Sequence, residues 1–437
     1  MLKCNAERIR KNIETLAGFT RTPGQGCTRL SYTKEFREAG HYIIEEMRSA
    51  GLTVREDAAG NIIGRLEAIG GEGTFPEASK RPVILTGSHF DSVPCGGNFD
   101  GAAGIFAALE AVRVMKEHKI IPAVPVEVIA MPEEEGSRFG GGLFASRAIC
   151  SGVTTDELRS ALDREGISQY EAMKSYGLDP DTIASVRRSS HEIAAYLELH
   201  IEQGPVLEQQ QTRVGIVDSI VGLRCCQITV RGRADHAGTT PLPLRADALL
   251  ASAKAITAAT EAASLEGNGT VVTFGAITSG PAASNIVQST VHFTADCRSC
   301  SSASIRRVMD AFEDSLKQSR QNVPGAAELS WEIQTTLDAP PVLMDTALKQ
   351  LLSDTAKELH LPAASLPSGA GHDAMNFASL CPTAMIFVPS RGGRSHCPEE
   401  WTNYQQIADG ADVLLHTLLK LFSHFRKNGI AAIMPAR

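Results

Sequence analysis

Histidines and acidic residues stand together where the sequence pattern ends one predicted element and begins the next. His89 ends the apolar run 82–89, Asp91 lies two residues beyond it, and Asp100 follows at the start of a predicted helix. Histidine is a good ligand for zinc-like cations, and a carboxylate two residues further on can orient its ring. Asp100 could cap the helix or bridge two metal ions, and the residues alone leave both roles open.

Three adjacent glutamates, Glu133–Glu135, come just after the apolar run 124–131 and just before a glycine-rich turn. Such a run usually lies in solvent, because neighbouring carboxylates repel one another. Next to cations, however, one glutamate can bind metal while its neighbour remains free to accept a proton. Hydrolysis with two metal ions requires both functions.

Two further histidines complete the set. His200 lies near the end of the apolar run 196–201, and His396 lies in a loop after the apolar run 383–388. In α/β sheets, binding sites form outside the carboxyl ends of the strands. One such residue would carry little weight, but five candidate ligands at these positions predict a metal-dependent hydrolytic site.

Other catalytic arrangements find less support in the sequence. No Gly-x-Ser-x-Gly pattern occurs, so the serine nucleophile of an α/β-hydrolase lacks its usual turn. No phosphate-binding loop or dinucleotide fingerprint occurs at a strand-to-helix turn. The glycines at 140–142 lack the lysine and hydroxyl that a phosphate loop requires.

The elements that must position these side chains predict an α/β core. Apolar spacing predicts helices over 7–19, 33–51 and 101–116. Short apolar runs predict buried strands over 82–89, 124–131 and 196–201. Strands that alternate with helices favour a mainly parallel sheet.

The pattern changes from about residue 214. Long β-like runs cover 214–234, 270–278 and 285–298, and helices are predicted over 245–263 and 302–319. This combination favours an α+β insert with an antiparallel sheet. After residue 331 the α/β pattern returns, with a strand over 383–388 and a helix over 404–425. We therefore expect a discontinuous catalytic domain, 1–213 and 332–437, interrupted by an inserted domain, 214–331.

The bulk properties fit this organisation. A chain of 437 residues exceeds the size of most single cores, so two domains are expected. A net charge of -8 argues against a nucleic-acid partner, and no apolar run is long enough to suggest a membrane span. The ten cysteines follow no regular framework, which favours reduced thiols in a cytoplasmic protein.

Six motifs, read in chain order, carry a resemblance to a known family. They are GSHFDSV, FDGAAG, EEEGSRF, LHIEQGP, DHAGTTP and SHCPEEWT. Together they resemble the amidase/hydantoinase/carbamoylase branch of the aminoacylase-like dinuclear metallopeptidases. That branch includes N-carbamoyl-L-amino acid hydrolases, allantoate amidohydrolases and one class of β-ureidopropionase. The match extends from Gly87 to Trp401.

The resemblance implies an α/β catalytic domain with an inserted α+β lid domain that also forms a homodimer. It implies two divalent ions per subunit, with Zn, Mn, Co and Ni all compatible with the ligands. One ion would be held by His89, Asp100 and His200, and the other by Asp100, Glu135 and His396. Glu134 would act as the general base, and Asp91 would orient His89.

The resemblance also assigns residues to a small, carboxylate-bearing substrate. His236 of the inserted domain would reach the active site of the neighbouring subunit and bind the reacting carbonyl oxygen. Asn285 and Arg298 would bind the substrate carboxylate, since a guanidinium can donate two parallel hydrogen bonds to it. Gln203 and Gly371 match further substrate-facing positions.

The implied reaction is hydrolysis of the carbamoyl C–N bond of N-carbamoyl-L-amino acids to the amino acid, CO2 and ammonia. A hydroxide bridging the metal ions would attack, with Glu134 as the base. Allantoate amidohydrolase and β-ureidopropionase are alternatives, because these enzymes share nearly every motif. A non-catalytic binding protein of the same fold is a remote alternative, because every ligand position and the base are present.

Overall fold

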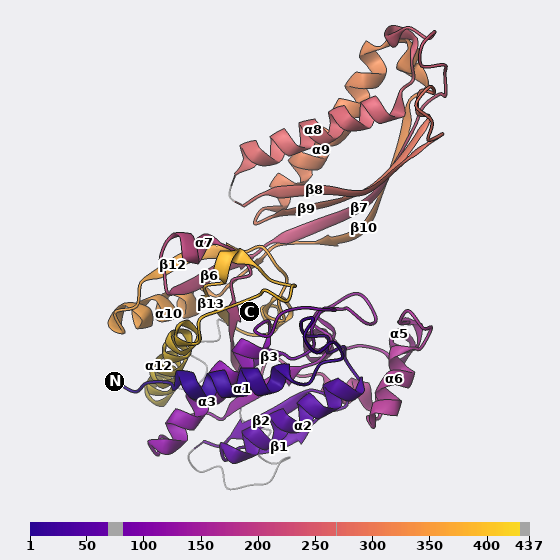
Figure 1. Cartoon of the computed structure of the whole chain (residues 1–437). Helices are drawn as coiled ribbons and strands as arrows, with labels where there is room; N and C mark the ends of the chain where they lie inside the picture. The colour runs from indigo at the N-terminus through magenta and orange to yellow at the C-terminus, as the bar shows by residue number, and fades with distance from the viewer. Residues whose placement is uncertain (69–81, 268, 429–437) are drawn as a thin grey trace. The chain divides into compact units, whose positions relative to one another are not determined.

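The computed structural model describes residues 1–68, 82–267 and 269–428. The chain forms two compact units, coloured along the sequence in Figure 1. The first unit comprises Met1–Asp218, Met344–Leu366 and Gly371–Arg437, and the second comprises Ser219–Leu343 and Pro367–Ala370. The chain leaves and re-enters the first unit at adjacent points, because Met344 N donates a hydrogen bond to Asp218 O at 3.0 Å.

Four parallel strands form the centre of the first unit. Their order is β4 (Val126–Met131), β3 (Val83–His89), β5 (Ile193–Ile201) and β13 (Thr383–Val388). Every residue of these strands is buried. Continuous apolar runs are typical of parallel strands that are covered on both faces. The predicted α/β class with a mainly parallel sheet is therefore confirmed.

Further strands extend this sheet on both sides. On one side β2 (Ile62–Leu66) pairs with β4, and β1 (Thr53–Glu56) pairs with β2. On the other side β6 (Val214–Ile220) pairs with β13, and β12 (Ala363–Ser368) pairs with β6. The central strands were predicted from the sequence, but β1, β2 and β12 were not, because they are short and only partly apolar.

Helices cover the parallel strands. α3 (Ala102–Glu117) and α12 (Tyr404–Asn428) pack against β5, and α1 (Ala6–Ala17) packs against both helices. α2 (Lys34–Ser49) packs against β1 and β2. α3 is buried on nearly all sides, which explains why its sequence is alanine-rich and lacks a polar face. Smaller elements of this unit are α4 (Phe144–Cys150), α5 (Thr155–Ser160), α6 (Gln169–Tyr176), α7 (Val206–Gln209), α10 (Thr346–Glu358) and α11 (Ala374–Phe377).

The second unit is an antiparallel sheet with two long helices. The strand order is β10 (Ser330–Ala339), β7 (Gly222–Arg231), β9 (Thr290–Ser299) and β8 (Val271–Gly280). α8 (Ala248–Glu266) and α9 (Ser302–Asn322) pack together and against this sheet (Figure 1). The short strand β11 (Val342–Leu343) pairs with Ser219 and Ile220. This arrangement agrees with the expected α+β insert.

The second unit contains more residues than the insert predicted from the sequence. The expected insert, 214–331, ends inside β10, whereas this unit extends to Leu343 and also takes in Pro367–Ala370. The physical reason is that β10 pairs with β7 along its length, from Ser330 opposite Arg231 to Ala339 opposite Leu223. The expected catalytic segments were 1–213 and 332–437, whereas the first unit continues to Asp218 and resumes at Met344.

Among the described helices, none is both long and apolar enough to cross a membrane. All ten cysteines are free thiols.

A stability prediction follows from the close approach of β3 and β4. Gly87 has φ +144°, and a Cβ atom there would lie 1.9 Å from the carbonyl oxygen of Ile129. We expect Gly87→Ala to lower the free energy of unfolding by about 3 kcal/mol or more, because the backbone of β3 or β4 must move to make room for the Cβ atom. Gly371→Ala is the matched control, since its Cβ would meet only Met375 Sδ, at 3.7 Å. Denaturant unfolding of both variants checks this; equal stability would contradict it.

Candidate functional site

The site forms where the central parallel strands end. His89, the last residue of β3, lies opposite Met131, the last residue of β4. His200 of β5 lies opposite Phe387 of β13. The register therefore places two histidines beside the starting points of the loops that follow β4 and β13. Those loops carry the glutamate run and His396.

Two groups of side chains at this edge could hold a metal ion. One group contains His89, Asp100 and His200, and the other contains Asp100, Glu135 and His396. Within each group the ligand atoms all lie within 4.8 Å of one another. The structure thus brings together all five residues expected to bind metal, with Asp100 common to both groups.

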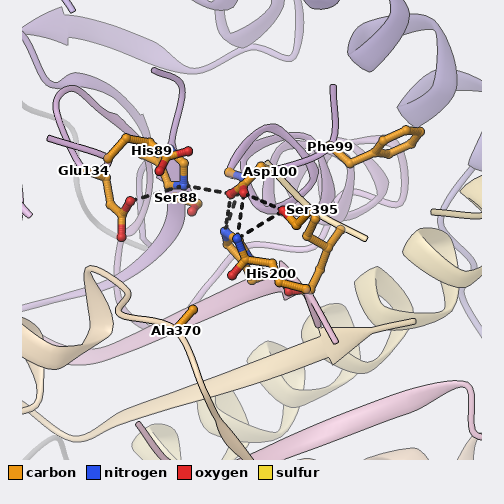
Figure 2. A network of polar contacts seen from close by, with 12 residues as sticks. Ser88, His89, Phe99, Asp100, Glu134, His200, Ala370 and Ser395 are labelled. Atoms are coloured by element: carbon orange, nitrogen blue, oxygen red, sulfur yellow. Dashed lines mark hydrogen bonds and ion pairs between the residues drawn. The ribbon is translucent and has the colours of Figure 1, made fainter. Parts of the chain in front are cut away.

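The two oxygens of Asp100 face different histidines. Figure 2 shows His89 and His200 beside Asp100. Oδ1 lies 3.3 Å from His89 Nε2 and 3.1 Å from His200 Nε2. Oδ2 lies 3.3 Å from His396 Nε2. On the second side, His396 Nε2 is also 3.5 Å from Glu135 Oε2. A carboxylate with one oxygen towards each group is the arrangement that a bridging ligand requires.

Contacts at Nδ1, the ring nitrogen that faces away from Asp100, orient the buried histidines His89 and His200. His200 Nδ1 lies 2.9 Å from the carbonyl oxygen of Ile201, and His89 Nδ1 lies 3.3 Å from that of Asp91. A proton on Nδ1 satisfies these carbonyls and leaves Nε2 free as the ligand atom. The carboxylate of Asp91 is 3.5 Å from His89 Nδ1, so Asp91 lies beside the ring that it is expected to orient.

Asp91 also fixes the glutamate run. Its Oδ1 accepts a hydrogen bond from Glu134 N at 3.1 Å, and its Oδ2 accepts one from Glu135 N at 3.2 Å. One carboxylate therefore contacts a candidate ligand ring on β3 and the backbone of the candidate base and ligand after β4. This second function of Asp91 is not visible in the sequence.

The three glutamates have different environments. Glu135 belongs to a ligand group, and Glu134 Oε2 lies 3.8 Å from His89 Nε2. Glu133 instead accepts a hydrogen bond from Phe139 N at 2.9 Å and lies buried beneath the following loop. Gly142 lets this loop fold back, because a Cβ there would be 2.7 Å from the carbonyl oxygen of Glu134. The run is therefore not a solvated acidic surface.

The donor set fits divalent cations. Three imidazoles and two carboxylates suit ions such as Zn, Mn, Co and Ni. Glu135 Oε1 is buried and has no hydrogen-bond partner among the described residues. A buried carboxylate oxygen without a donor is energetically costly, and a cation would satisfy it.

The pKa values indicate an excess of acid in the site. Burial raises the pKa of Glu134 well above its usual value, and burial with repulsion from Asp100 raises that of Glu135 to about 8. Burial would also raise the pKa of Asp100, but hydrogen bonds from His200, His396 and His89 hold it well below its usual range. Imidazoles supply the only balancing charge within these groups, and divalent ions would supply more.

Two buried acids beneath the site were not singled out from the sequence. Glu198 of β5 accepts hydrogen bonds from Ser88 Oγ at 2.7 Å and Ala374 N at 3.2 Å. Burial and repulsion from Glu198 raise the pKa of Asp373 to about 7. Glu198 could have been found, because a charged residue inside a fully buried strand is unusual.

Gln203 lies closer to the metal-binding groups than its expected substrate-facing role suggests. Its Nε2 donates to Asp100 Oδ2 at 2.7 Å and lies 3.3 Å from His396 Nε2. Its Oε1 is buried without a partner among the described residues. Gly371 is exposed in the loop after β12. No contact in the structure tests a substrate role for either residue.

In the second unit, His236 and Asn285 lie on paired segments. His236 forms a bridge with Ile286, and Ala237 N donates to the carbonyl oxygen of Asn285 at 3.0 Å. His236 Nδ1 accepts hydrogen bonds from Gly238 N at 3.0 Å and Thr239 N at 3.2 Å. In the neutral ring the proton must then be on Nε2, so this exposed histidine presents a donor.

Arg298, near the end of β9, is held in a fixed orientation. Its Nε and Nη2 donate to Asp296 at 2.9 and 3.1 Å, and its Nη1 donates to the carbonyl oxygen of Gly369 at 3.0 Å. A guanidinium has five N–H groups. These three contacts leave one on each Nη, which is enough for a bidentate bond to another carboxylate.

Comparisons with known proteins agree with this geometry. Residues 85–420 match the family described as peptidase family M20/M25/M40. The chain belongs to this family.

Relatives within the M20 family narrow the assignment. The chain is 42% identical over 419 residues to an N-carbamoyl-L-amino-acid amidohydrolase of Paenarthrobacter aurescens, covering 96% of this chain and 98% of the relative. It is 36% identical over 416 residues to an allantoate amidohydrolase of Escherichia coli (strain K12), covering 95% and 98%. It is therefore a hydrolase of carbon–nitrogen bonds other than peptide bonds.

A solved structure supports the same branch of the M20 family. A hydantoinase/carbamoylase family amidase from Burkholderia multivorans superposes with a TM-score of 0.86 at 31% identity. The superposition covers 96% of this chain and 98% of the amidase. The resemblance to the amidase/hydantoinase/carbamoylase branch is confirmed.

Metal stoichiometry tests the shared position of Asp100. We expect Asp100→Ala to remove both bound ions, because its carboxylate belongs to both groups. His200→Ala and His396→Ala should each reduce the content by about one ion, since each histidine belongs to one group. Elemental analysis of the folded variants after dialysis measures this. Equal metal loss in all three variants would contradict the division into two groups.

Proposed function

We propose that the chain is a metal-dependent amidohydrolase that releases ammonia and CO2 from N-carbamoyl-L-amino acids. The observation that carries the proposal is the paired ligand arrangement around Asp100, with the spare carboxylate of Glu134 beside it. The named N-carbamoyl-L-amino-acid relatives support the choice of substrate.

Glu134 is the proposed general base. The two groups would hold divalent ions such as Zn, Mn, Co or Ni. These ions would act as Lewis acids and lower the pKa of a water molecule. Glu134 takes a proton from the attacking water and passes it to the departing nitrogen. Its backbone is fixed by Asp91, which limits where its carboxylate can reach. Burial raises its pKa, and bound cations would lower it again.

The substrate carboxylate is the proposed ligand of Arg298 and Asn285. The two unused N–H groups of Arg298 suit a carboxylate, and the amide of Asn285 is exposed and can donate as well. His236 can donate from Nε2 to the carbonyl oxygen on which negative charge develops. Gln203 and Gly371 complete the proposed substrate contacts.

The oligomeric state, the cellular location and a second candidate activity are also proposals. Homodimerisation through the second unit would present His236 to the neighbouring subunit. A cytoplasmic location stays a prediction from the cysteine content. Allantoate hydrolysis is the second candidate activity, because relatives with that name are 36% identical to this chain.

A substrate panel tests the proposed activity. The protein is stripped of metal, reloaded with Mn, Zn, Co or Ni, and given N-carbamoyl-L-amino acids, allantoate or N-carbamoyl-β-alanine. We expect the fastest ammonia release from an N-carbamoyl-L-amino acid. Faster release from allantoate would favour the second candidate, and no release from any compound would reject the proposal.

Replacement of the base tests the mechanism. We expect Glu134→Gln to lower kcat by about 10²- to 10⁴-fold, because the amide cannot accept the proton. Metal content should remain unchanged, since Glu134 belongs to neither ligand group. Steady-state kinetics and elemental analysis measure the two effects. Full activity with full metal content would remove Glu134 from the mechanism.

Replacement of Arg298 tests carboxylate binding. We expect Arg298→Ala to raise KM by about 10- to 100-fold with a smaller change in kcat, because charge-assisted hydrogen bonds are lost. Arg224→Ala is the matched control. Arg224 lies opposite the neighbouring Cys297 in the same sheet and pairs with Asp338 at 2.6 Å. An unchanged KM for Arg298→Ala would place the carboxylate elsewhere.

A further inference from the structure

Glu400 is a buried carboxylate that the proposed reaction does not use. It lies in the loop after β13 and its exposed fraction is 3%. Acidic residues are seldom this buried unless they have partners that compensate for lost hydration. Its neighbour Glu399 is exposed, so the burial is particular to one member of this acidic pair.

One oxygen of Glu400 contacts the segment that carries Asp100, and the other contacts Ser395. Oε1 accepts hydrogen bonds from Phe99 N at 2.9 Å and from Asp100 N at 3.1 Å. Oε2 lies 2.7 Å from Ser395 Oγ, and the same hydroxyl lies 3.1 Å from Asp100 Oδ2. In Figure 2, Ser395 lies beside Asp100, on the side away from Glu134. Glu400 thus reaches both the backbone and the side chain of Asp100.

The carboxylate packs directly onto the backbone of this segment. A Cβ atom at Gly97 would lie 2.0 Å from Glu400 Oε1 and 2.4 Å from its Cβ. Position 97 therefore cannot carry a side chain while Glu400 keeps its place. This fit and the two backbone hydrogen bonds fix the turn that leads from Gly97 into α3.

The network also places two carboxylates around one hydroxyl. Ser395 has a single proton, so it can donate to Glu400 or to Asp100 but not to both at once. The hydroxyl of Ser395 therefore links the Glu400 carboxylate to the Asp100 carboxylate.

We propose that Glu400 is a positioning residue for the metal centre. It holds the Asp100 backbone through two amide hydrogen bonds and the Asp100 carboxylate through Ser395, so that one oxygen faces each ligand group. The proposal rests on the proposed metal-dependent function. It predicts that Glu400 controls the affinity for metal without itself binding metal.

Metal affinity measured apart from activity tests this proposal. Metal-free protein is titrated with Mn²⁺, and free Mn²⁺ is followed by electron paramagnetic resonance. Mn²⁺ is chosen because the chain has ten free cysteines, and sulfur ligands prefer softer ions. We expect Glu400→Ala to weaken Mn²⁺ binding by about 10- to 100-fold.

Two variants serve as comparisons. Glu400→Gln keeps an oxygen for the amides of Phe99 and Asp100, and its NH2 group can donate to Ser395, so we expect affinity within about threefold of the parent chain. Glu399→Ala removes the exposed neighbour, which pairs with Arg394 at 3.1 Å, and should leave affinity unchanged. A loss in Glu399→Ala equal to that in Glu400→Ala would overturn the proposal.

Circular dichroism of the metal-free variants checks that they are folded. A folded Glu400→Ala with unchanged Mn²⁺ affinity overturns the proposal. If Glu400→Ala does not fold, Ser395→Ala decides, because it removes the bridge to Asp100 and leaves both backbone hydrogen bonds. It should weaken binding severalfold, and unchanged affinity rejects the proposal. If the parent chain binds no Mn²⁺ or other divalent ion, the proposed function fails instead.

Discussion

The candidate metal centre depends on the placement of one carboxylate. Asp100 belongs to both ligand groups, and its two oxygens face different histidines. Its position is set by tight backbone geometry just before α3. Gly101 has φ +61°, and a Cβ there would lie 2.4 Å from the carbonyl oxygen of His89. A side chain at that position would push apart the bridging carboxylate and the first histidine.

The rest of the first unit supports this arrangement through shared contacts. Parallel strands bring His89 and His200 to one edge of the sheet, and Asp91 joins the end of β3 to the backbone after β4. Three buried acids near the centre, Asp91, Glu198 and Glu400, each contact at least two neighbours. Such a network is costly without cations, because the carboxylates outnumber their positive partners. A divalent ion at either ligand group would offset this excess of negative charge.

Much of this was predictable from sequence because the central strands are continuous apolar runs. These runs located β3, β4 and β13 within about two residues, and the ligand positions followed from the strand ends. The end of the insert was not predictable, because β10 alternates exposed and half-buried residues and pairs with β7, about a hundred positions earlier. Glu400 and Glu198 were missed for a related reason. Their partners are distant in the chain, and only the folded backbone shows which acids are buried.

The adjacent entry and exit of the inserted segment have an evolutionary consequence. Asp218 and Met344 are joined by a backbone hydrogen bond. The two ends of the inserted segment therefore meet the first unit at adjacent residues. An ancestral protein could have gained this segment without disturbing the β5–β13 pairing that underlies the metal ligands. The insert could then change in sequence while the strands that carry the candidate metal ligands stayed constant.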